Sequence, residues 1–429
     1  MASAGLSIEW GKMTECGTEQ AFAWSVEKYG EIGVDVEAAL RRLSSVPLSI
    51  HCWQGDDVTG FEPNRATLAG SGLAVTGSYP GRARSAAELR KDLEKTLSLI
   101  PGRHRVNLHA MYGEFPKAVD RDAIRPEHFR SWLDWARERG LGLDFNATLF
   151  AHPKASSGFT LSSTDEGVRR FWVEHVRRSR EVAALLGHDL GNPCTHNVWV
   201  PDGEKDAVVD RWERRSLLRK SLDEAFSYPY SVSEMKDSIE GKLWGIGSES
   251  FVVGSYDFYV GYALSRGLML CLDTGHFHPT ESVADKISAI LQFSGELLIH
   301  VSRGERWDSD HVALCDDGLR AVMAEVVRAG ALDRVHFALD YFDAGMNRIA
   351  AWVIGARATL KALLAALLEP TERLRELDAA GGRALLEESK TMPLGVVWDY
   401  HCVSSGVPSD GEWMAEVRKY ESEVMSGRS

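Results

Sequence analysis

The octapeptide LDTGHFHP (272–279) places an aspartate, a glycine and two histidines directly after the apolar run LMLC. Carboxylate oxygens and imidazole nitrogens are ligands for Mn²⁺, Mg²⁺, Co²⁺ or Zn²⁺, so this composition suits a divalent metal site without thiolates. Asp273 and His276 are three residues apart, and a turn at Gly275 would let both side chains address neighbouring positions. The segment is therefore either part of a metal site or a polar turn that contains histidines.

Acidic and imidazole residues also follow other apolar runs. Asp308 and Asp310 are two residues apart in RWDSDH, so they would point the same way in an extended loop. The full set of candidate ligands is Glu240, Asp273, His276, His300, Asp308, Asp310 and Asp340. Each residue alone would more often be a hydrogen-bonded core residue or part of a solvated turn. Together they favour metal binding at one common place, because buried charges are costly without partners or metal, and seven candidate ligands are more than one metal ion needs.

Four further polar residues lie close to these candidates. Lys242 follows Glu240 by two residues and would, taken alone, be a surface lysine or a salt-bridge partner. His278 and His311 are not expected to be ligands, and Asp343 is expected to cap a turn.

The segments that must position these residues are short apolar runs between long amphipathic stretches. This alternation is typical of strands and helices around a parallel sheet. The eight runs predicted as strands are 47–53, 105–112, 141–150, 196–201, 238–247, 267–275, 296–303 and 334–342. Eight such units predict a (β/α)8 TIM barrel over residues 46–350. A doubly wound open sheet is the alternative, but no G-x-G-x-x-G turn supports it.

Three of the intervening helices have predicted ends. The stretch 85–100 begins with Ser85 and Glu88, which are spaced as a capping box. The helix starting at PEHF is expected to end at Gly140, and the helix starting at DEGV is expected to end at Gly187.

All strands of a (β/α)8 barrel end on one face, where the active site is built. The candidate ligands and Lys242 fall inside or just after the carboxyl ends of the predicted strands, so we expect them to converge there. Trp53, Phe150 and Trp199 are expected at the same face. They are either ordinary rim packing or the flat walls of a pocket for a sugar ring or a methyl group.

The two ends of the chain lie outside the predicted barrel. Residues 1–45 form an N-terminal segment with a helix, and residues 351–429 form a helical C-terminal extension with breaks at Pro370 and at Gly381–Gly382. The extension is too thin to hold a core of its own, so it is expected to wrap this barrel or a neighbouring subunit.

Composition excludes several classes of function. A net charge of −13 disfavours nucleic acid as a partner, since phosphates require a basic surface. The six cysteines are far apart without a C-x-x-C pair, which indicates reduced thiols. The N-terminus lacks the pattern of a signal peptide, and no long apolar run is expected to span a membrane. A cytoplasmic location is therefore predicted.

Four stretches resemble the L-rhamnose isomerase family of bacterial sugar catabolism: HCWQGDDV, LDTGHFHPTE, HVSRGERWDSDHV and NRIAAWVIGARATLKALLAALLEPT. The resemblance runs from about Glu19 to near the C-terminus. It implies a xylose-isomerase-like (β/α)8 barrel assembled as a homotetramer. It also implies two divalent ions, with Mn²⁺ at the one that acts on substrate and Zn²⁺, Co²⁺ or Mg²⁺ possible at the structural one.

The resemblance also implies roles for individual residues. The structural ion would be held by Glu240, Asp273, His300 and Asp340. The catalytic ion would be held by His276, Asp308 and Asp310. The residues implied to contact the sugar are His109 and Trp199, and Trp53, Phe150 and Lys242 are the further candidates for this contact.

The implied reaction interconverts L-rhamnose and L-rhamnulose by moving hydrogen between C1 and C2. Either a hydride shift or an enediol route would serve, and the hydride shift is favoured. Asp310 could relay the O2 proton, Lys242 could hydrogen-bond the C1 oxygen, and His109 could open the sugar ring. The alternatives are a metal-dependent hydrolase or sugar-phosphate epimerase, for which Arg303 and Arg306 lie close to the ligands, and a sugar-binding scaffold without turnover.

Overall fold

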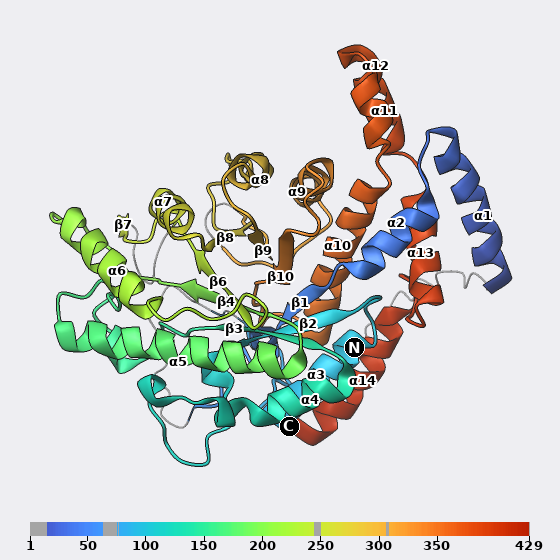
Figure 1. The fold of residues 1–429 in the computed structure, drawn as a ribbon. Coiled ribbons are helices and arrows are strands. Elements are labelled where there is room, and N and C mark those ends of the chain that lie inside the picture. The colour runs from blue at the N-terminus through green and yellow to red at the C-terminus, as the bar shows by residue number, and fades with distance from the viewer. Residues whose placement is uncertain (1–14, 63–74, 76, 244–249, 306–308, 429) are drawn as a thin grey trace, which may run out of the picture.

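The computed structural model describes residues 15–62, 75, 77–243, 250–305 and 309–428. A closed barrel of eight parallel strands lies at its centre (Figure 1). In barrel order the strands are β1 (Leu48–His51), β2 (His104–His109), β3 (Gly142–Asn146), β4 (Cys194–Trp199), β6 (Met235–Glu240), β8 (Met269–Asp273), β9 (Leu297–Val301) and β10 (Val335–Leu339). All eight predicted strands are present, and the predicted (β/α)8 barrel is confirmed. The short antiparallel pair β5 (Gly203–Glu204) and β7 (Phe251–Val252) was not predicted.

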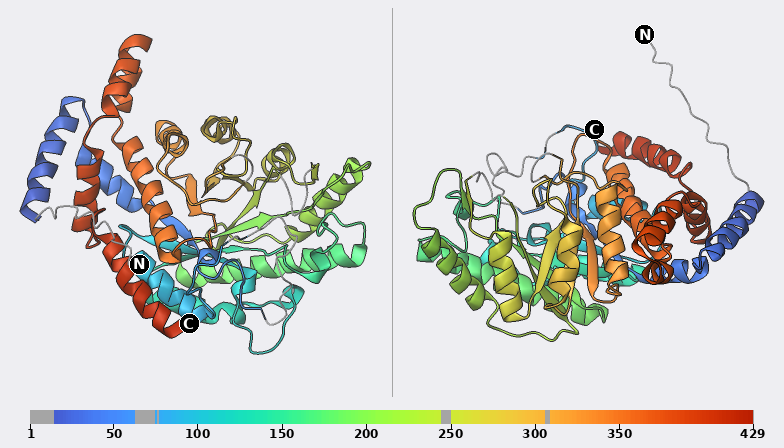
Figure 2. Two further views of the ribbon diagram at one scale, coloured as in Figure 1. Left: turned by 180° about the vertical axis from the view of Figure 1, so that it is seen from behind. Right: turned by 90° about the horizontal axis from the view of Figure 1, so that it is seen from above.

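Helices follow the strands and cover the outside of the barrel (Figures 1 and 2). They are α3 (Ala86–Leu97), α4 (Arg130–Arg139), α5 (Glu166–Leu190), α6 (Arg211–Ala225), α7 (Tyr256–Arg266), α8 (Val283–Leu291), α9 (Asp317–Arg328) and α10 (Arg348–Leu367). Apolar strand residues such as Val106 and Leu108 are buried in the core, while Asn107 lines a cavity inside the barrel. Because strand side chains alternate between faces, this barrel has polar groups in its interior at positions that branched aliphatic residues usually fill.

The predicted helix ends are partly correct. Ser85 caps α3 by accepting a hydrogen bond from the Glu88 N–H, but the Glu88 carboxylate accepts from the Arg84 N–H, so the capping box is incomplete. Gly140 ends α4 with a left-handed φ of 64°, as predicted.

Gly187 does not end α5, and this prediction was wrong. The helix continues to Leu190 and ends at Gly191, whose φ is 60°. At Gly187 an added Cβ would lie 1.8 Å from the carbonyl oxygen of Glu234. The glycine is therefore required by the close approach of two backbones, which a local pattern does not reveal.

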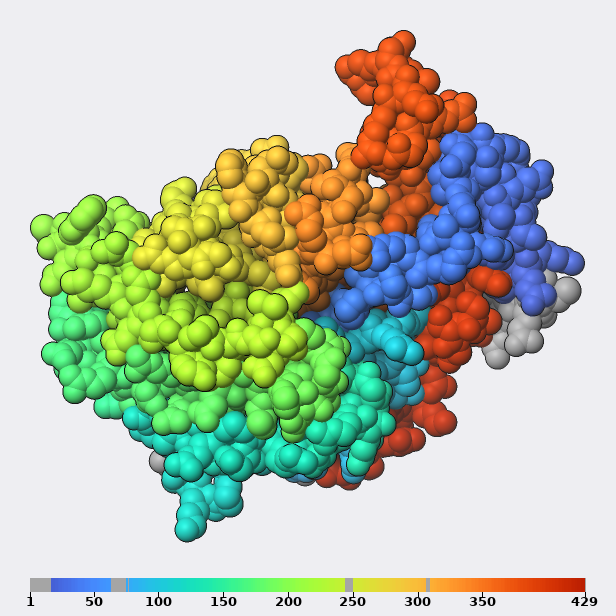
Figure 3. All heavy atoms as spheres, viewed as in Figure 1, coloured from blue at the N-terminus to red at the C-terminus, as the bar shows by residue number. Residues whose placement is uncertain are grey.

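The remaining helices pack beside the barrel or project from it. They are α1 (Glu15–Glu31), α2 (Val36–Ser45), α11 (Thr371–Glu376), α12 (Ala379–Ser389), α13 (Leu394–Ser404) and α14 (Trp413–Arg428). α1 packs on α13, where Phe22 stacks on Tyr400 with ring centroids 3.6 Å apart. α11 and α12 extend away from the barrel (Figures 1 and 3).

Breaks in the C-terminal helices follow the sequence only in part. Pro370 precedes α11 as predicted. Gly381 and Gly382 lie inside α12, and the break falls instead before that helix, where Asp378 accepts hydrogen bonds from the N–H groups of the first turn. An aspartate cap thus decides this boundary, since two glycines weaken a helix without ending it.

Among the described residues, α10 alone is long and apolar enough to cross a membrane, contrary to the prediction that such a run is missing. The apolar window of this helix is 83% buried inside the protein. α10 contacts α2, α3, α9 and β1, so its apolar character is explained by its place as a core helix.

Candidate metal centre and sugar pocket

The carboxyl ends of neighbouring strands bring four candidate ligands together. Glu240 is the last residue of β6, Asp273 is the last of β8, His300 lies in β9 and Asp340 follows β10. Asp273 and His300 are directly paired across β8 and β9. One ligand atom from each of the four residues lies within 4.8 Å of the others, and Glu240, Asp273 and His300 are buried.

Short distances join the oxygen and nitrogen atoms of this first cluster. His300 Nδ1 lies 2.9 Å from Asp340 Oδ2 and 3.2 Å from Glu240 Oε2. Asp273 Oδ2 is buried and has no hydrogen-bond donor among the described residues. Buried carboxylate oxygens almost always have a partner. The orphaned oxygen and the oxygen-rich ligand set therefore fit a hard divalent cation.

A second group shares Asp273 with the first. Asp273, His276 and Asp310 also offer ligand atoms within 4.8 Å of one another. His276 Nε2 lies 2.8 Å from Asp310 Oδ1 and 3.6 Å from Asp273 Oδ2. Lys242 Nζ lies 3.1 Å from Asp310 Oδ2. The structure thus brings together six of the seven candidate ligands; Asp308 lies outside the described residues.

Neighbouring groups orient the carboxylates of the candidate ligands. Asn197 Nδ2 donates to Glu240 Oε2 at 2.6 Å, and Trp53 Nε1 donates to Asp340 Oδ1 at 3.2 Å. Asp273 Oδ1 accepts from the Gly275 N–H at 2.7 Å and from the Ser302 hydroxyl. Such outer contacts hold ligands in place for metal binding. The spacing of polar residues in the sequence did not single out Asn197 or Ser302, although an asparagine inside a buried strand is a usable signal.

The carboxylates of the cluster have pKa shifts in opposite directions. Burial raises the pKa of Asp273 well above its usual value, and the nearby Asp340 and Asp310 raise it further. Burial also acts to raise the pKa of Glu240, but His300 and His276 outweigh it and hold this pKa well below the usual value. Carboxylates so close together cannot all stay charged without a compensating cation. A bound cation would remove this conflict.

A pocket lined by aromatic rings opens above the cluster. Its volume is about 440 Å³ when the part open to solvent is included, and its walls include Trp53, His109, Phe150 and Trp199. The His109 ring lies 4.8 Å from that of Trp53 and 5.5 Å from that of Phe150, measured between centroids. Lys242 Nζ lies 5.2 Å from the centroid of Trp199. The predicted sugar-contact residues thus share one pocket with Glu240, His276, Asp310 and Asp340.

His109 lies among the aromatic walls of this pocket and is buried. Burial and the charge of Arg121 lower its pKa to about 3, so its ring is neutral at physiological pH. Its Nδ1 lies 3.1 Å from the hydroxyl oxygen of Thr148. The pocket also includes Asn146, Val58 and Phe342, which no pattern in the sequence indicated.

The residues expected to stay out of the site have other contacts. His278 Nδ1 lies 2.7 Å from Thr280 Oγ1 on the same loop. His311 pairs through its backbone with Arg303. Asp343 accepts a hydrogen bond from the Gly345 N–H, which confirms its role in a turn.

A phosphate ester would need a free arginine near the cluster. Arg303 Nε donates to the carbonyl oxygen of Val312, and its guanidinium is paired with Glu305. Arg306 lies outside the described residues. The arginine that the structure places near the ligands is thus engaged within its own loop.

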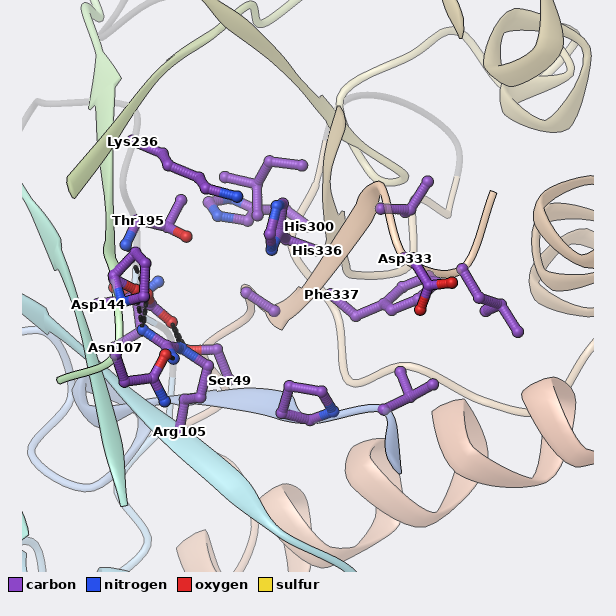
Figure 4. A pocket seen from close by; sticks show the side chains of 18 of the residues that line it. Ser49, Arg105, Asn107, Asp144, Thr195, Lys236, His300, Asp333, His336 and Phe337 are labelled. Carbon is purple, nitrogen blue, oxygen red and sulfur yellow. Dashed lines mark hydrogen bonds and ion pairs between the residues drawn. The ribbon is translucent and has the colours of Figure 1, made fainter. Parts of the chain in front are cut away.

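A larger cavity lies inside the amino end of the barrel (Figure 4). Its volume is about 980 Å³ when the part open to solvent is included, and polar side chains including Asn107, Asp144, Lys236 and His336 surround it. Its charged groups are paired internally, as Arg105 is with Asp144 at 2.8 Å. His300 lines it, but none of the four cluster carboxylates does, so the aromatic pocket is the better candidate site.

Fold and site together define a (β/α)8-barrel protein with a buried carboxylate and histidine cluster beneath an aromatic pocket. A profile of the L-rhamnose isomerase (RhaA) family matches residues 16–428. The L-rhamnose isomerase of Rhodopirellula baltica is 56% identical over 415 residues, which cover 96% of this chain and 97% of that protein. The Escherichia coli K12 L-rhamnose isomerase is 52% identical over 414 residues, covering 96% and 99%. The chain therefore belongs to the L-rhamnose isomerase family.

Similarity to solved structures is weaker. A structure of L-ribulose 3-epimerase has 15% sequence identity and a TM-score of 0.47, covering 78% of this chain and 98% of that one.

Proposed function

We propose that this protein is an aldose–ketose isomerase that interconverts L-rhamnose and L-rhamnulose by hydrogen transfer between C1 and C2. The observation that carries the proposal is the cluster of Glu240, Asp273, His276, His300, Asp310 and Asp340 under an aromatic pocket, in a chain of this family. The flat aromatic side chains of the pocket and the polar cluster beneath them suit a small sugar, whose faces are apolar and whose edges carry hydroxyl groups.

Divalent cations, with Mn²⁺ at the working site, are the proposed cofactors. Glu240, Asp273, His300 and Asp340 would hold a structural ion; Zn²⁺, Co²⁺ or Mg²⁺ would also suit it. His276 and Asp310, with Asp308, would hold the catalytic ion. When bound, such cations stabilise the negative charge that develops on the sugar oxygens.

Side chains of this chain would then perform the remaining steps. Lys242 can donate a hydrogen bond to the C1 oxygen, and it also neutralises Asp310, which lies 3.1 Å away. Asp310 would relay the O2 proton. His109 would assist ring opening as a neutral imidazole, because its pKa of about 3 leaves it uncharged. Trp53, Phe150 and Trp199 would enclose the sugar and limit access of water.

A hydride shift between C2 and C1 fits these groups better than an enediol. The enediol route requires a base strong enough to remove a proton from carbon. Although burial acts to raise the pKa of Asp310, Lys242 and His276 hold it well below its usual value. His109, with a pKa of about 3, is likewise a weak base. L-Rhamnose deuterated at C2 tests this choice: a hydride shift delivers the label to C1, whereas an enediol loses it to water.

The direct test of function uses protein stripped of metal. L-Rhamnose is added with and without Mn²⁺, and ketose formation is followed. We expect L-rhamnulose only when metal is restored. No L-rhamnulose in the presence of Mn²⁺ would refute the proposal.

Assembly and location complete the proposed description. We propose a homotetramer in the cytoplasm, as the resemblance to the L-rhamnose isomerase family implies. Light scattering of the purified protein tests the oligomeric state.

A further inference from the structure

A buried arginine outside the pocket clamps the loop that carries one of its walls. Arg121 is 2% exposed and lies in the connection between β2 and α4. Its Nε and Nη2 bind the two carboxylate oxygens of Glu62 at 2.9 and 2.8 Å. Its remaining N–H groups point at the loop after β3.

The guanidinium bonds three carbonyl oxygens of that loop. Nη1 donates to Thr148 O at 2.8 Å and to Phe150 O, while Nη2 donates to Ala151 O at 3.4 Å. These contacts and the Glu62 pair occupy all five N–H donors that an arginine has. Lysine has three donors and no planar fork, so it cannot reproduce this set.

The loop needs such a clamp because its backbone is strained. Ala151 has a φ of 50°, in the left-handed region that residues with a Cβ disfavour. The strained residue directly follows Phe150, which lies against His109 and Trp199 in the pocket. Release of the turn would therefore move an aromatic wall of the pocket.

A second path joins Arg121 to His109, one of the two histidines that line the pocket. The Arg121 carbonyl oxygen accepts from His175 Nδ1 at 2.9 Å, and His175 Nε2 accepts from the Thr148 N–H at 2.9 Å. The hydroxyl of the same threonine lies 3.1 Å from His109 Nδ1. Both the backbone and the side chain of Arg121 thus hold the segment from Thr148 to Ala151.

We propose that Arg121 is a positioning residue for substrate binding: it holds the left-handed turn at Ala151 and so fixes Phe150 in the sugar pocket. This inference rests on the proposed sugar contact of Phe150. Since the wall would bind the sugar equally in ground and transition states, its displacement raises KM and leaves kcat nearly unchanged.

The test compares Arg121→Lys with the wild type in the metal-loaded enzyme. We expect KM for L-rhamnose to rise about tenfold while kcat changes less than about threefold. Metal content and the circular dichroism spectrum verify that the variant is folded and loaded. A folded, loaded Arg121→Lys enzyme with an unchanged KM would overturn the proposal.

Rescue separates positioning from general destabilisation. Adding Ala151→Gly to Arg121→Lys should recover most of the KM, because glycine adopts the left-handed conformation without strain. Ala151→Gly in the wild-type background should change KM little. A raised KM in Arg121→Lys with no recovery in the double variant would contradict the proposed route through the turn.

Two variants cover the remaining outcomes. If Arg121→Lys does not fold, Ala151→Val decides, since a β-branched residue at this φ should displace the loop and raise KM with the clamp intact. An unchanged KM in Ala151→Val would then refute the proposal. Phe150→Leu tests the proposed sugar contact separately. An unchanged KM in Phe150→Leu would refute that contact. A raised KM in Phe150→Leu with an unchanged KM in the Arg121 and Ala151 variants would refute only the role of Arg121.

Discussion

Asn197 offers a sharp test of how the barrel interior supports the candidate metal cluster. Its Nδ2 donates to Glu240 Oε2 at 2.6 Å, and both side chains are almost completely buried. Asn197→Leu keeps a similar volume and removes the donor. The Glu240 carboxylate then loses a partner that water cannot easily replace.

The expected magnitude follows from the charge of the acceptor. A hydrogen bond to a charged group contributes about 1.5–3 kcal/mol. Since about 1.4 kcal/mol corresponds to tenfold in affinity, we expect Mn²⁺ to bind roughly 10- to 100-fold more weakly. Loss of an outer contact of a metal ligand commonly has an effect of about this size.

Asn146 supplies a matched control. It is paired directly with Asn197 across β3 and β4 and lines the same pocket, but its Nδ2 donates to the uncharged Asn107 Oδ1 at 2.6 Å and to Leu108 O. Asn146→Leu should change Mn²⁺ affinity less than about threefold.

The assay is a calorimetric titration of metal-stripped protein with Mn²⁺, supported by the paramagnetic resonance signal of the free ion. Wild-type affinity in Asn197→Leu, or an equal loss in both variants, would refute the reasoning that the Glu240 contact orients a ligand.

Three further predictions concern stability. Gly187→Ala should lower Tm and the free energy of unfolding, the latter by about 1–3 kcal/mol, because the added Cβ would clash with the facing backbone. Gly261→Ala is the control: this exposed helix position has open space around it, so the substitution should raise Tm slightly. Equal shifts of Tm in the two variants would contradict the prediction. Arg428→Ala should lower the free energy of unfolding in urea by about 3 kcal/mol, because it leaves the buried Asp92 carboxylate without the guanidinium 2.7 Å away. A decrease below about 1 kcal/mol would mean that this ion pair contributes no more than an exposed one. The hydrogen bond with His336 is the main cause that lowers the pKa of Glu296 from 4.5 to about 2. The stability that Glu296 contributes is therefore complete above pH 4.5 and is lost as the pH falls toward 2. The difference in Tm between wild type and Glu296→Gln should shrink over that pH range, and a constant difference would contradict the prediction.

Local pattern was sufficient for the barrel. Alternating apolar runs predicted all eight strands, since a buried strand and an amphipathic helix leave different periods in the sequence. Helix ends were less predictable, because the same residue type serves several purposes. Gly187 allows two backbones to approach closely, while Gly191, directly after the last helical residue Leu190, provides the actual C-cap of α5.

The sequence predicted the residue types at the site, but only part of the contacts between them. Carboxylates and histidines at strand ends indicated a metal site because parallel strands end on one face. The structure adds that Asp273 belongs to both ligand groups and that Asn197 and Ser302 orient the carboxylates. These contacts join residues far apart in the chain, so no spacing in the sequence reports them.

The sequence by itself determined the order of the barrel strands and their helices, the residue types at the candidate metal site and the membership of the family. Only the tertiary structure decided that Arg121 clamps the loop carrying Phe150 and that an added Cβ at Gly187 would meet the carbonyl oxygen of Glu234. The physical reason is that burial and periodicity are local properties of a chain, whereas a contact depends on how the closed barrel brings distant segments together.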